Sequence, residues 1–255
     1  MRRALAVIIM VIVITVPFAV FDVLPDIGDP QSAPNTHVSD YYIENAVSEC
    51  NSPNMVTAVI VDYRAFDTMF ETTVMFLAGV CVVMILANKP KRKIIVPRSF
   101  RMFRKTGDPI YRTVNKDVMI SVIEPIILVY AVYVLFHGEV SLGGGFQAGA
   151  LIGMTYLLDV MVGKRKNGLI HVTKFESAAV AGVGPFIYAL CGILTMLGGG
   201  LFLEYAEFPA GVDTAELHSI GILMVEIGVT IGVMGTIITI LNALRERIKF
   251  DDDND

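Results

Sequence analysis

Residues 137–149 read HGEVSLGGGFQAG and place a histidine, a glutamate and three consecutive glycines between two strongly apolar segments. Glycine permits backbone angles that other residues avoid, and it leaves nearby amides and carbonyls uncovered. A tight turn between two helices would need fewer glycines and would not place Gln147 inside the next helix. Uncovered backbone between membrane segments is tolerated only where protein buries it or where it lines a water-filled cavity. The stretch therefore predicts a turn built into the interior of a helical membrane protein.

The composition supports a chain that lies largely in lipid. Its 255 residues are 54% hydrophobic, and the mean hydropathy is +0.63. A helix needs about 20 apolar residues to cross a hydrocarbon layer about 30 Å thick. Six apolar runs approach this length: residues 4–21, 68–87, 118–136, 146–162, 178–201 and 219–241. We therefore predict an all-α integral membrane protein with about six transmembrane helices.

The first run has two interpretations. Arg2 and Arg3 precede it, as basic residues precede the apolar core of a secretory signal peptide. Its apolar core is longer than the usual 7–15 residues, and no small-residue cleavage site follows closely. We expect a retained helix, with a cleaved signal peptide as the alternative.

The basic residues predict the orientation of the chain. With a cytoplasmic N-terminus, six crossings would return the C-terminus to the cytoplasm. Cytoplasmic segments would then hold 19 of the 20 lysines and arginines, with Arg64 as the exception. Such a bias in short loops orients membrane helices. The outer segments are acidic, which follows from the same asymmetry or attracts cations toward a pore.

A basic segment divides the predicted helices into two groups. Residues 88–116 carry 10 of the 20 basic residues and several prolines, which break any continuous helix. We expect a two-helix unit at 1–88, a cytoplasmic linker at 89–112 and a four-helix unit at 113–255. We find no internal repeat, which disfavours a self-contained inverted-repeat transporter.

Charged residues gather at the outer end of the second run, in VIVDYRAFDTMFETTVMF, residues 59–76. The apolar part is too short to cross alone, so Asp67 and Glu71 are drawn toward the membrane, one helical turn apart. Arg64 lies three residues before Asp67 and can pair with it. Asp62 would need a bend in the backbone to join them. The group is either an interfacial ion-pair cluster or a place where cations or protons enter.

Two further carboxylates lie in predicted spans toward the cytoplasmic side. Glu124 precedes Pro125, whose missing N–H breaks the helical hydrogen-bond ladder and makes room for water. It is a candidate for ion or proton translocation, or for a hydrogen bond between helices. Asp159 is followed by the basic residues 164–166, and an ion pair with them explains it without a transport role.

The deepest predicted charge is Glu226, in the last apolar run. An isolated carboxylate inside a membrane is a functional candidate, because burying its charge is costly. His218 precedes it by eight residues, and we expect the two to lie on nearly the same face as an outward proton path. Glycines along this run would let a neighbouring helix approach closely.

The motifs resemble two known subunits. HGEVSLGGGFQAGALIG and HSIGILMVEIGVTIGVMG are similar to the MnhB/MrpB family, over about residues 110–248. NMVTAVIVDYRAFDTMFETTV resembles the C-terminal part of the large MrpA subunit, which occurs as a separate, small E-type subunit in membrane-bound hydrogenase-type complexes. Leu142 and Ala148 stand where many members have proline and glycine, and Ala65 and Phe70 replace glycines. The chain resembles two neighbouring subunits fused into one.

This resemblance implies a subunit of an Mrp-type Na⁺/H⁺ antiporter, or of the membrane arm of a respiratory complex, in a prokaryotic cell membrane. Its partners would be large antiporter-like subunits, small helical subunits and, in redox-driven complexes, a hydrogenase-like iron–sulfur arm. The chain would carry Na⁺ and H⁺ without being an enzyme. Candidate residues for ion translocation are Glu226, Glu124, Asp67, Glu71, His218 and His137. Residues with a structural or ion-pairing role would be Asp62, Arg64, Asp159, Gly143, Gly144 and Gly145.

Two other functions stay open. A structural linker would use the same carboxylates for hydrogen bonds between helices, and a stand-alone secondary transporter would move ions by itself. The three cysteines and four histidines show no metal-ligand spacing, and we expect no metal and no cofactor in this chain. The basic segment next to a membrane helix favours anionic lipid headgroups over nucleic acid.

Overall fold

The computed structural model describes residues 2–21, 24–32, 34–87, 114–162 and 174–253. These residues form helices and no strand, which confirms the all-α class. A helix coincides with each of the six predicted apolar runs. These helices are α1 (Arg2–Phe21), α4 (Ala65–Ala87), α6 (Val114–Phe136), α7 (Gly145–Val162), α8 (Lys174–Gly198) and α9 (Thr214–Asp253). The predicted linker at 89–112 and the basic residues 164–166 lie outside the described residues.

Three of these helices are long and apolar enough to cross a membrane. They cover Ala65–Ala87, Glu176–Gly198 and Thr214–Arg247, and the described residues hold two shorter apolar helices, Val7–Phe21 and Ile120–Phe136. A membrane location follows from these helices. Six crossings and two cytoplasmic termini stay predictions.

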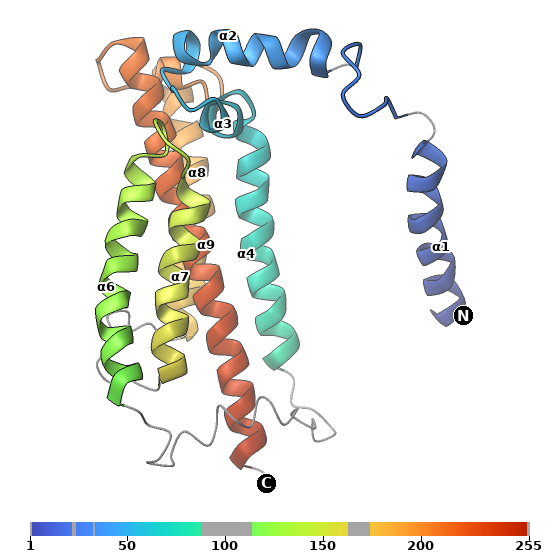
Figure 1. The fold of residues 1–255 in the computed structure, drawn as a ribbon, viewed down its shortest axis with the longest axis vertical. Helices are drawn as coiled ribbons and strands as arrows, with labels where there is room; N and C mark the ends of the chain where they lie inside the picture. Colours follow the sequence, from blue (N-terminus) through green and yellow to red (C-terminus); the bar gives the residue numbers. More distant parts are fainter. Residues whose placement is uncertain (1, 22–23, 33, 88–113, 163–173, 254–255) are drawn as a thin grey trace. The chain divides into compact units, whose positions relative to one another are not determined.

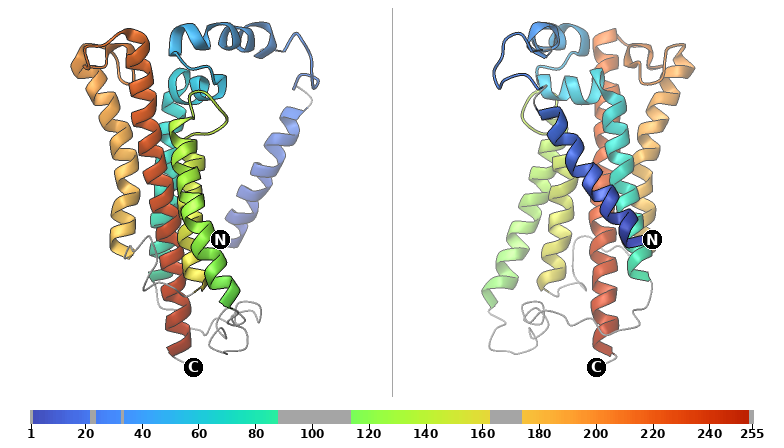
Figure 2. Two further views of the ribbon diagram at one scale, coloured as in Figure 1. Left: turned by 60° about the vertical axis from the view of Figure 1, so that its left-hand side comes forward. Right: turned by 90° about the vertical axis from the view of Figure 1, so that its right-hand side faces the viewer.

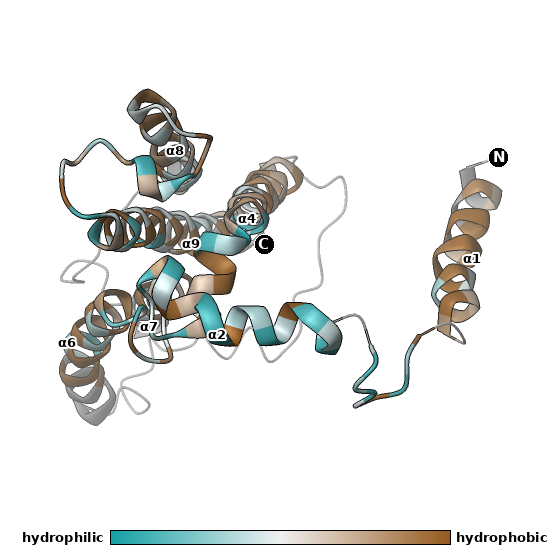
Figure 3. Ribbon diagram, turned by 90° about the horizontal axis from the view of Figure 1, so that it is seen from above, coloured by the Kyte–Doolittle hydropathy of each residue, from teal (hydrophilic) through white to brown (hydrophobic). Residues whose placement is uncertain are grey.

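The chain forms two compact units, Met1–Asn45 and Ala46–Asp255. The first contains α1, whose apolar side chains are exposed along its length, as suits a helix surrounded by lipid. It also contains a short π-helical segment, Pro34–Val38, and the first residues of α2 (Ser39–Cys50). α2 is largely polar (Figure 3).

The second unit is organised around α9. Helices α8, α7 and α4 all pack against it, and α6 packs on α7 (Figures 1 and 2). The turns of α4, α6 and α8 that are visible from above are mostly hydrophobic (Figure 3). Glu226 lies on α9 about 18 Å from the first residue of that helix, at 1.5 Å of rise per residue. The helix with this carboxylate is therefore covered by protein on several sides.

Glycines set the distance between α9 and its neighbours. On α7, a Cβ atom added at Gly145 would lie 2.4 Å from the carbonyl oxygen of Glu226, and one at Gly149 would lie 2.7 Å from that of Thr230. On α8, Gly184 lies directly against Gly232 of α9. Such contacts hold membrane helices together through close backbone packing.

We expect Gly184→Ala to destabilise the bundle. Its Cβ would lie 2.4 Å from the Cα of Gly232 and 2.6 Å from the carbonyl oxygen of Gly228, and backbone atoms cannot move aside cheaply. Overpacking of this kind costs about 1–3 kcal/mol, so thermal melting of the detergent-solubilised protein should occur at a lower temperature.

Gly182→Ala is the matched control on the same helix. A Cβ there would be in ordinary contact with the Phe76 ring at 3.5 Å, so melting should be almost unchanged. Equal melting temperatures for the two variants would contradict the role given to Gly184.

Candidate functional site

A broken helix precedes α4. The segment begins with α3 (Met55–Thr57), continues as a π-helix over Ala58–Tyr63, and is interrupted at Arg64, where φ is −120° and ψ is 35°. Side chains donate hydrogen bonds to the carbonyl groups around this break. The Thr68 hydroxyl donates to the carbonyl of Ile60 at 2.7 Å, and the Tyr205 hydroxyl donates to that of Val61 at 2.9 Å. Interrupted helices are tolerated in membranes where neighbouring groups satisfy the backbone in this way.

The charges near this break do not form one cluster. Arg64 pairs with Asp67, as expected, and both side chains are exposed. Glu71 is exposed one turn further along α4. Asp62 does not join this group. Asp62 instead faces α9, where its Oδ2 lies 2.6 Å from Nδ1 of His218, because the π-helical turn directs it into the bundle.

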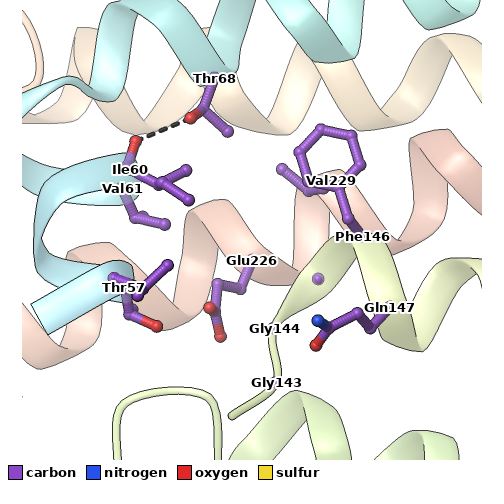
Figure 4. A pocket seen from close by; sticks show the side chains of 12 residues that line it. Thr57, Ile60, Val61, Thr68, Gly143, Gly144, Phe146, Gln147, Glu226 and Val229 are labelled. Carbon is purple, nitrogen blue, oxygen red and sulfur yellow. Dashed lines mark hydrogen bonds between the residues drawn. The ribbon is translucent and has the colours of Figure 1, made fainter. Parts of the chain in front are cut away.

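His218 and Glu226 do not share a face of α9, in contrast to the expectation. Eight residues turn a helix by about 800°, which leaves their side chains about 80° apart. The His218 ring contacts Asp62 and lies edge-on to Tyr205, with the ring centroids 6.2 Å apart. Glu226 points toward the glycine turn between α6 and α7 (Figure 4). The histidine therefore links α9 to the broken helix.

The glycine turn wraps around the carboxylate of Glu226. A Cβ atom at Gly138 would lie 2.8 Å from Oε2 and 2.9 Å from Oε1, and one at Gly144 would lie 3.0 Å from Oε1. Gly144 has a φ of +142°, which side chains rarely adopt. The glycines are thus needed because their missing side chains leave room for a carboxylate from another helix.

Hydrogen bonds also join the turn to the start of the broken helix. The Asn54 amide donates to the carbonyl oxygens of Gly138 and Ser141, each at 2.8 Å. The Thr57 hydroxyl donates to the carbonyl of Gly138 at 2.7 Å, and the Asn54 backbone N–H donates to that of Glu139 at 2.9 Å. The two sequence motifs therefore meet in space and form one structure around Glu226.

A cavity of about 140 Å³ opens between these elements. Its polar lining comes from Glu226, Thr57, Thr68 and Gln147, together with the glycine backbone, and apolar residues such as Val61 and Val229 complete it (Figure 4). Glu226 is 3% exposed, and its Oε2 is buried without a hydrogen-bond partner in the described part of the chain. The cavity has room for several water molecules, so it can hold a hydrated cation or a proton on the carboxylate.

The other predicted residues lie elsewhere. Glu124 and Asp159 are each 5% exposed, and they lie about 18 Å and 21 Å along α6 and α7 from the glycine turn. The basic residues expected to pair with Asp159 lie outside the described residues. His137 is exposed and stacks on Tyr133, with the ring centroids 4.1 Å apart. Of the three predicted glycines, Gly144 lies against the Glu226 carboxylate, Gly145 packs on its backbone, and Gly143 lies against Val134 and lines the cavity, whereas His137 and Glu124 lie away from this site.

Four polar residues of this site were not among the sequence candidates: Asn54, Thr57, Thr68 and Gln147. Asn54 and Thr57 stand at the start of the first recognisable motif, which was the available signal. Their role depends on contacts across more than 80 residues, which local patterns do not reveal.

We expect Asn54→Ala to loosen the glycine turn. The variant loses hydrogen bonds to Gly138 and Ser141, and bonds of this kind contribute about 0.5–1.5 kcal/mol each. The purified protein should therefore melt at a lower temperature, and cleavage by a protease between α6 and α7 should become faster. Asn45→Ala is the control, because that amide bonds the carbonyl of Tyr41 in its own helix. If both variants melt alike, Asn54 does not hold the turn.

Comparisons with known families match both motifs. Residues 116–239 match the family described as a domain related to the MnhB subunit of Na⁺/H⁺ antiporters, and residues 2–99 match the MbhE family, described as a subunit of MBH. A Staphylococcus haemolyticus protein named as a putative antiporter subunit, mnhB2, is 31% identical over 144 residues, or 55% of this chain and 96% of that protein. An uncharacterized protein of Methanocaldococcus jannaschii is 27% identical over 234 residues, or 86% of each chain.

Two solved complexes contain a similar fold. One is an archaeal respiratory membrane complex, the membrane-bound sulfane sulfur reductase. The match there is 26% identical with a TM-score of 0.61, and it covers 94% of this chain and 98% of that one. The other is the Mrp complex of Dietzia sp. DQ12-45-1b, at 23% identity and a TM-score of 0.64. That match covers 95% of this chain and 26% of the other, so this chain corresponds to one part of a larger subunit.

Proposed function

We infer that this chain, which belongs to the MnhB family of Na⁺/H⁺ antiporter subunits, is a membrane-located subunit of a cation/proton antiporter module. The mnhB2 relative is named as an antiporter subunit, and both similar structures are multisubunit membrane complexes. Its partners are other Mrp-type subunits. The MbhE match covers the first part of the chain, which supports a fusion of two subunits with units at 1–88 and 113–255 joined by the linker at 89–112.

One observation carries the translocation role: a carboxylate oxygen of Glu226, buried and without a hydrogen-bond partner among the described residues, faces a cavity with room for several water molecules. A charged carboxylate in such a place is costly unless a cation or proton neutralises it. The cavity also lies beside a broken helix, and transporters bind ions where unwound backbone lines a cavity. Glu226 therefore binds the transported monovalent cation, with Na⁺ as the expected one, or a proton.

The remaining carboxylates act as further steps in this proposal. Glu124 would continue the path toward the cytoplasmic end of the bundle, since it is buried at that depth on α6. Asp67 and Glu71 are exposed on α4, and exposed charges in a membrane need a covering partner. They would face an adjoining subunit. His218, paired with Asp62, holds the broken helix, and His137 lies at the surface of the turn.

The chain would work without being an enzyme, as a six-span protein of a prokaryotic cell membrane with both termini in the cytoplasm. The parent complex would be driven by an ion gradient or, as in the sulfane sulfur reductase complex, coupled to a redox enzyme. A hydrogenase-like iron–sulfur arm would then be a partner.

A structural linker is the second candidate, favoured by the hydrogen bonds that join the two motifs through Asn54, Thr57 and His218. A linker needs these bonds for assembly, but it does not need an unpartnered carboxylate beside a cavity. The two functions are therefore distinguished by variants that assemble normally.

The test is to tag the chain in its native host, purify it gently and identify the proteins that accompany it. The same host without the chain should lack Na⁺-dependent proton exchange in everted membrane vesicles, and the wild-type chain should restore it. Antiporter-like subunits alone would indicate a gradient-driven exchanger, and an additional iron–sulfur arm would indicate a redox-driven pump. A chain that purifies alone and moves ions in liposomes would replace this proposal with a stand-alone transporter.

A further inference from the structure

The cavity beside Glu226 has a buried inner end and an exposed mouth. At the inner end, the side chains of Thr57, Thr68 and Glu226 are all buried. The exposed lining residues, which mark the mouth, are Val56, Ile60 and Gln147. Among the lining residues that the structure describes, Gln147 is thus the one polar side chain at the mouth. An ion that enters from this side meets Gln147 before it reaches Glu226.

Gln147 is held at the mouth by the close packing of α7 on α9. It is the third residue of α7, in the first turn of that helix. A Cβ atom at Gly145, two residues earlier, would lie 2.4 Å from the carbonyl oxygen of Glu226, and one at Gly144 would lie 3.0 Å from its Oε1. The first turn of α7 therefore lies directly against the part of α9 that carries the carboxylate, and Gln147 and Glu226 line one cavity (Figure 4).

The two buried hydroxyl groups of the cavity present oxygen lone pairs to it. Thr57 and Thr68 each donate their hydroxyl proton to a backbone carbonyl at 2.7 Å. A hydroxyl has one proton to donate and two lone pairs that accept. The Thr57 oxygen also accepts a bond from the Asn54 amide at 2.9 Å, so the Thr68 oxygen keeps more acceptor capacity. Together with Glu226, the inner end therefore offers oxygen acceptors, which are ligands for a hard cation.

The charge of the cavity matches a cation with one positive charge. Among the lining residues that the structure describes, Glu226 is the one with an ionisable side chain. One carboxylate neutralises one positive charge, whereas a divalent cation would keep an uncompensated charge in a partly buried place, which is costly. Calcium sites reach their affinity through the number of charged ligands. The side chain of Gln147 has almost the shape of a glutamate but adds no charge.

We propose that Gln147 is the entry residue of the Glu226 cavity and makes the cavity selective for cations with a single positive charge. This proposal rests on the function inferred above and adds the residue that determines which cation is accepted. The amide oxygen of Gln147 takes the place of a water molecule on the entering ion without adding a second negative charge. The ion is then neutralised by Glu226, with the Thr68 oxygen as an uncharged ligand.

The experiment uses the complete complex, reconstituted in liposomes, with Na⁺-dependent proton exchange measured by a pH-sensitive dye while CaCl₂ is increased. At about pH 8 an added glutamate is ionised. Gln147→Glu should lower the Ca²⁺ concentration that halves exchange by at least about tenfold, because a second carboxylate in the cavity attracts a divalent ion across a few ångströms. Gln147→Leu, which lacks the amide oxygen, should raise the Na⁺ concentration for half-maximal exchange severalfold.

Leu142→Glu is the matched control. Leu142 belongs to the same turn, is 90% exposed and does not line the cavity, so a carboxylate there should leave the effect of Ca²⁺ as in the wild type. Equal Ca²⁺ inhibition of Gln147→Glu and the wild type would overturn the proposal. Equal sensitisation by Leu142→Glu would overturn it as well, because the effect would then come from surface charge.

The outcomes separate the role of Gln147 from the function itself. If Glu226→Gln abolishes exchange while both Gln147 variants behave as wild type, the selectivity role is wrong and the function stands. If Glu226→Gln also leaves exchange unchanged, both are wrong. Should Gln147→Glu fail to assemble, Gln147→Leu decides the question, because an unchanged Na⁺ dependence in that variant would overturn the proposal.

Discussion

Replacing Glu226 by glutamine should reduce Na⁺-dependent proton exchange to the background of vesicles that lack the complex. The amide has almost the shape of the carboxylate, so the cavity wall and the contacts with Gly138 and Gly144 should persist. What disappears is the negative charge, and with it both the cation ligand and the proton acceptor. The measurement is exchange in everted vesicles, beside the amount of assembled complex on a native gel.

Glu216→Gln is the control for this substitution, since it removes an exposed carboxylate from the same helix. It should leave exchange and assembly as in the wild type. A Glu226→Gln complex that assembles and exchanges normally would contradict the translocation role. Loss of assembly together with activity would favour the structural linker.

Replacing Gly138 by alanine should slow exchange roughly tenfold, which corresponds to about 1.4 kcal/mol, while the protein still folds. The new methyl group would meet Oε2 and Oε1 of Glu226 at 2.8 and 2.9 Å. These atoms end a flexible side chain, so they can move aside, unlike the backbone atoms that face Gly184. The carboxylate then leaves its place beside the cavity, and the ion loses its ligand. Exchange and thermal melting should be measured on the same preparation.

Gly182→Ala again serves as the control, because its methyl group has room beside Phe76. It should change neither exchange nor melting. Normal exchange by Gly138→Ala would show that Glu226 does not need its observed position. A large loss of stability would instead show that the turn serves the fold.

The helices were predictable because they depend on local composition. A run of about 20 apolar residues has few alternatives to a helix in lipid, since each backbone polar group must find a partner within the segment. The ion pair of Arg64 with Asp67 was predictable for the same reason, as it needs only a spacing of three residues along one helix.

Sequence spacing did not identify partners that lie far apart along the chain. Asp62 lies two residues from Arg64 in sequence, but the π-helical turn directs it to His218, 156 residues away. The expectation that His218 and Glu226 share a face of α9 was wrong, because eight residues along a helix leave about 80° between the two side chains. Asn54 and Thr57 were missed, because the carbonyl oxygen of Gly138 that both bond lies more than 80 residues away along the chain.

By itself the sequence determined that this is a helical membrane protein, that Glu226 is a costly charge in its last helix, and that three glycines stand where two apolar segments meet. The tertiary structure alone decided that the turn with these glycines lies against that glutamate, through Gly138 and Gly144, and that Asn54 and Thr57 hold the turn there. The physical reason is the distance along the chain over which each effect acts. Hydropathy and helical spacing act over a few turns, whereas the cavity is made by side chains from three separate parts of the chain, which meet only when α9 packs between its neighbours.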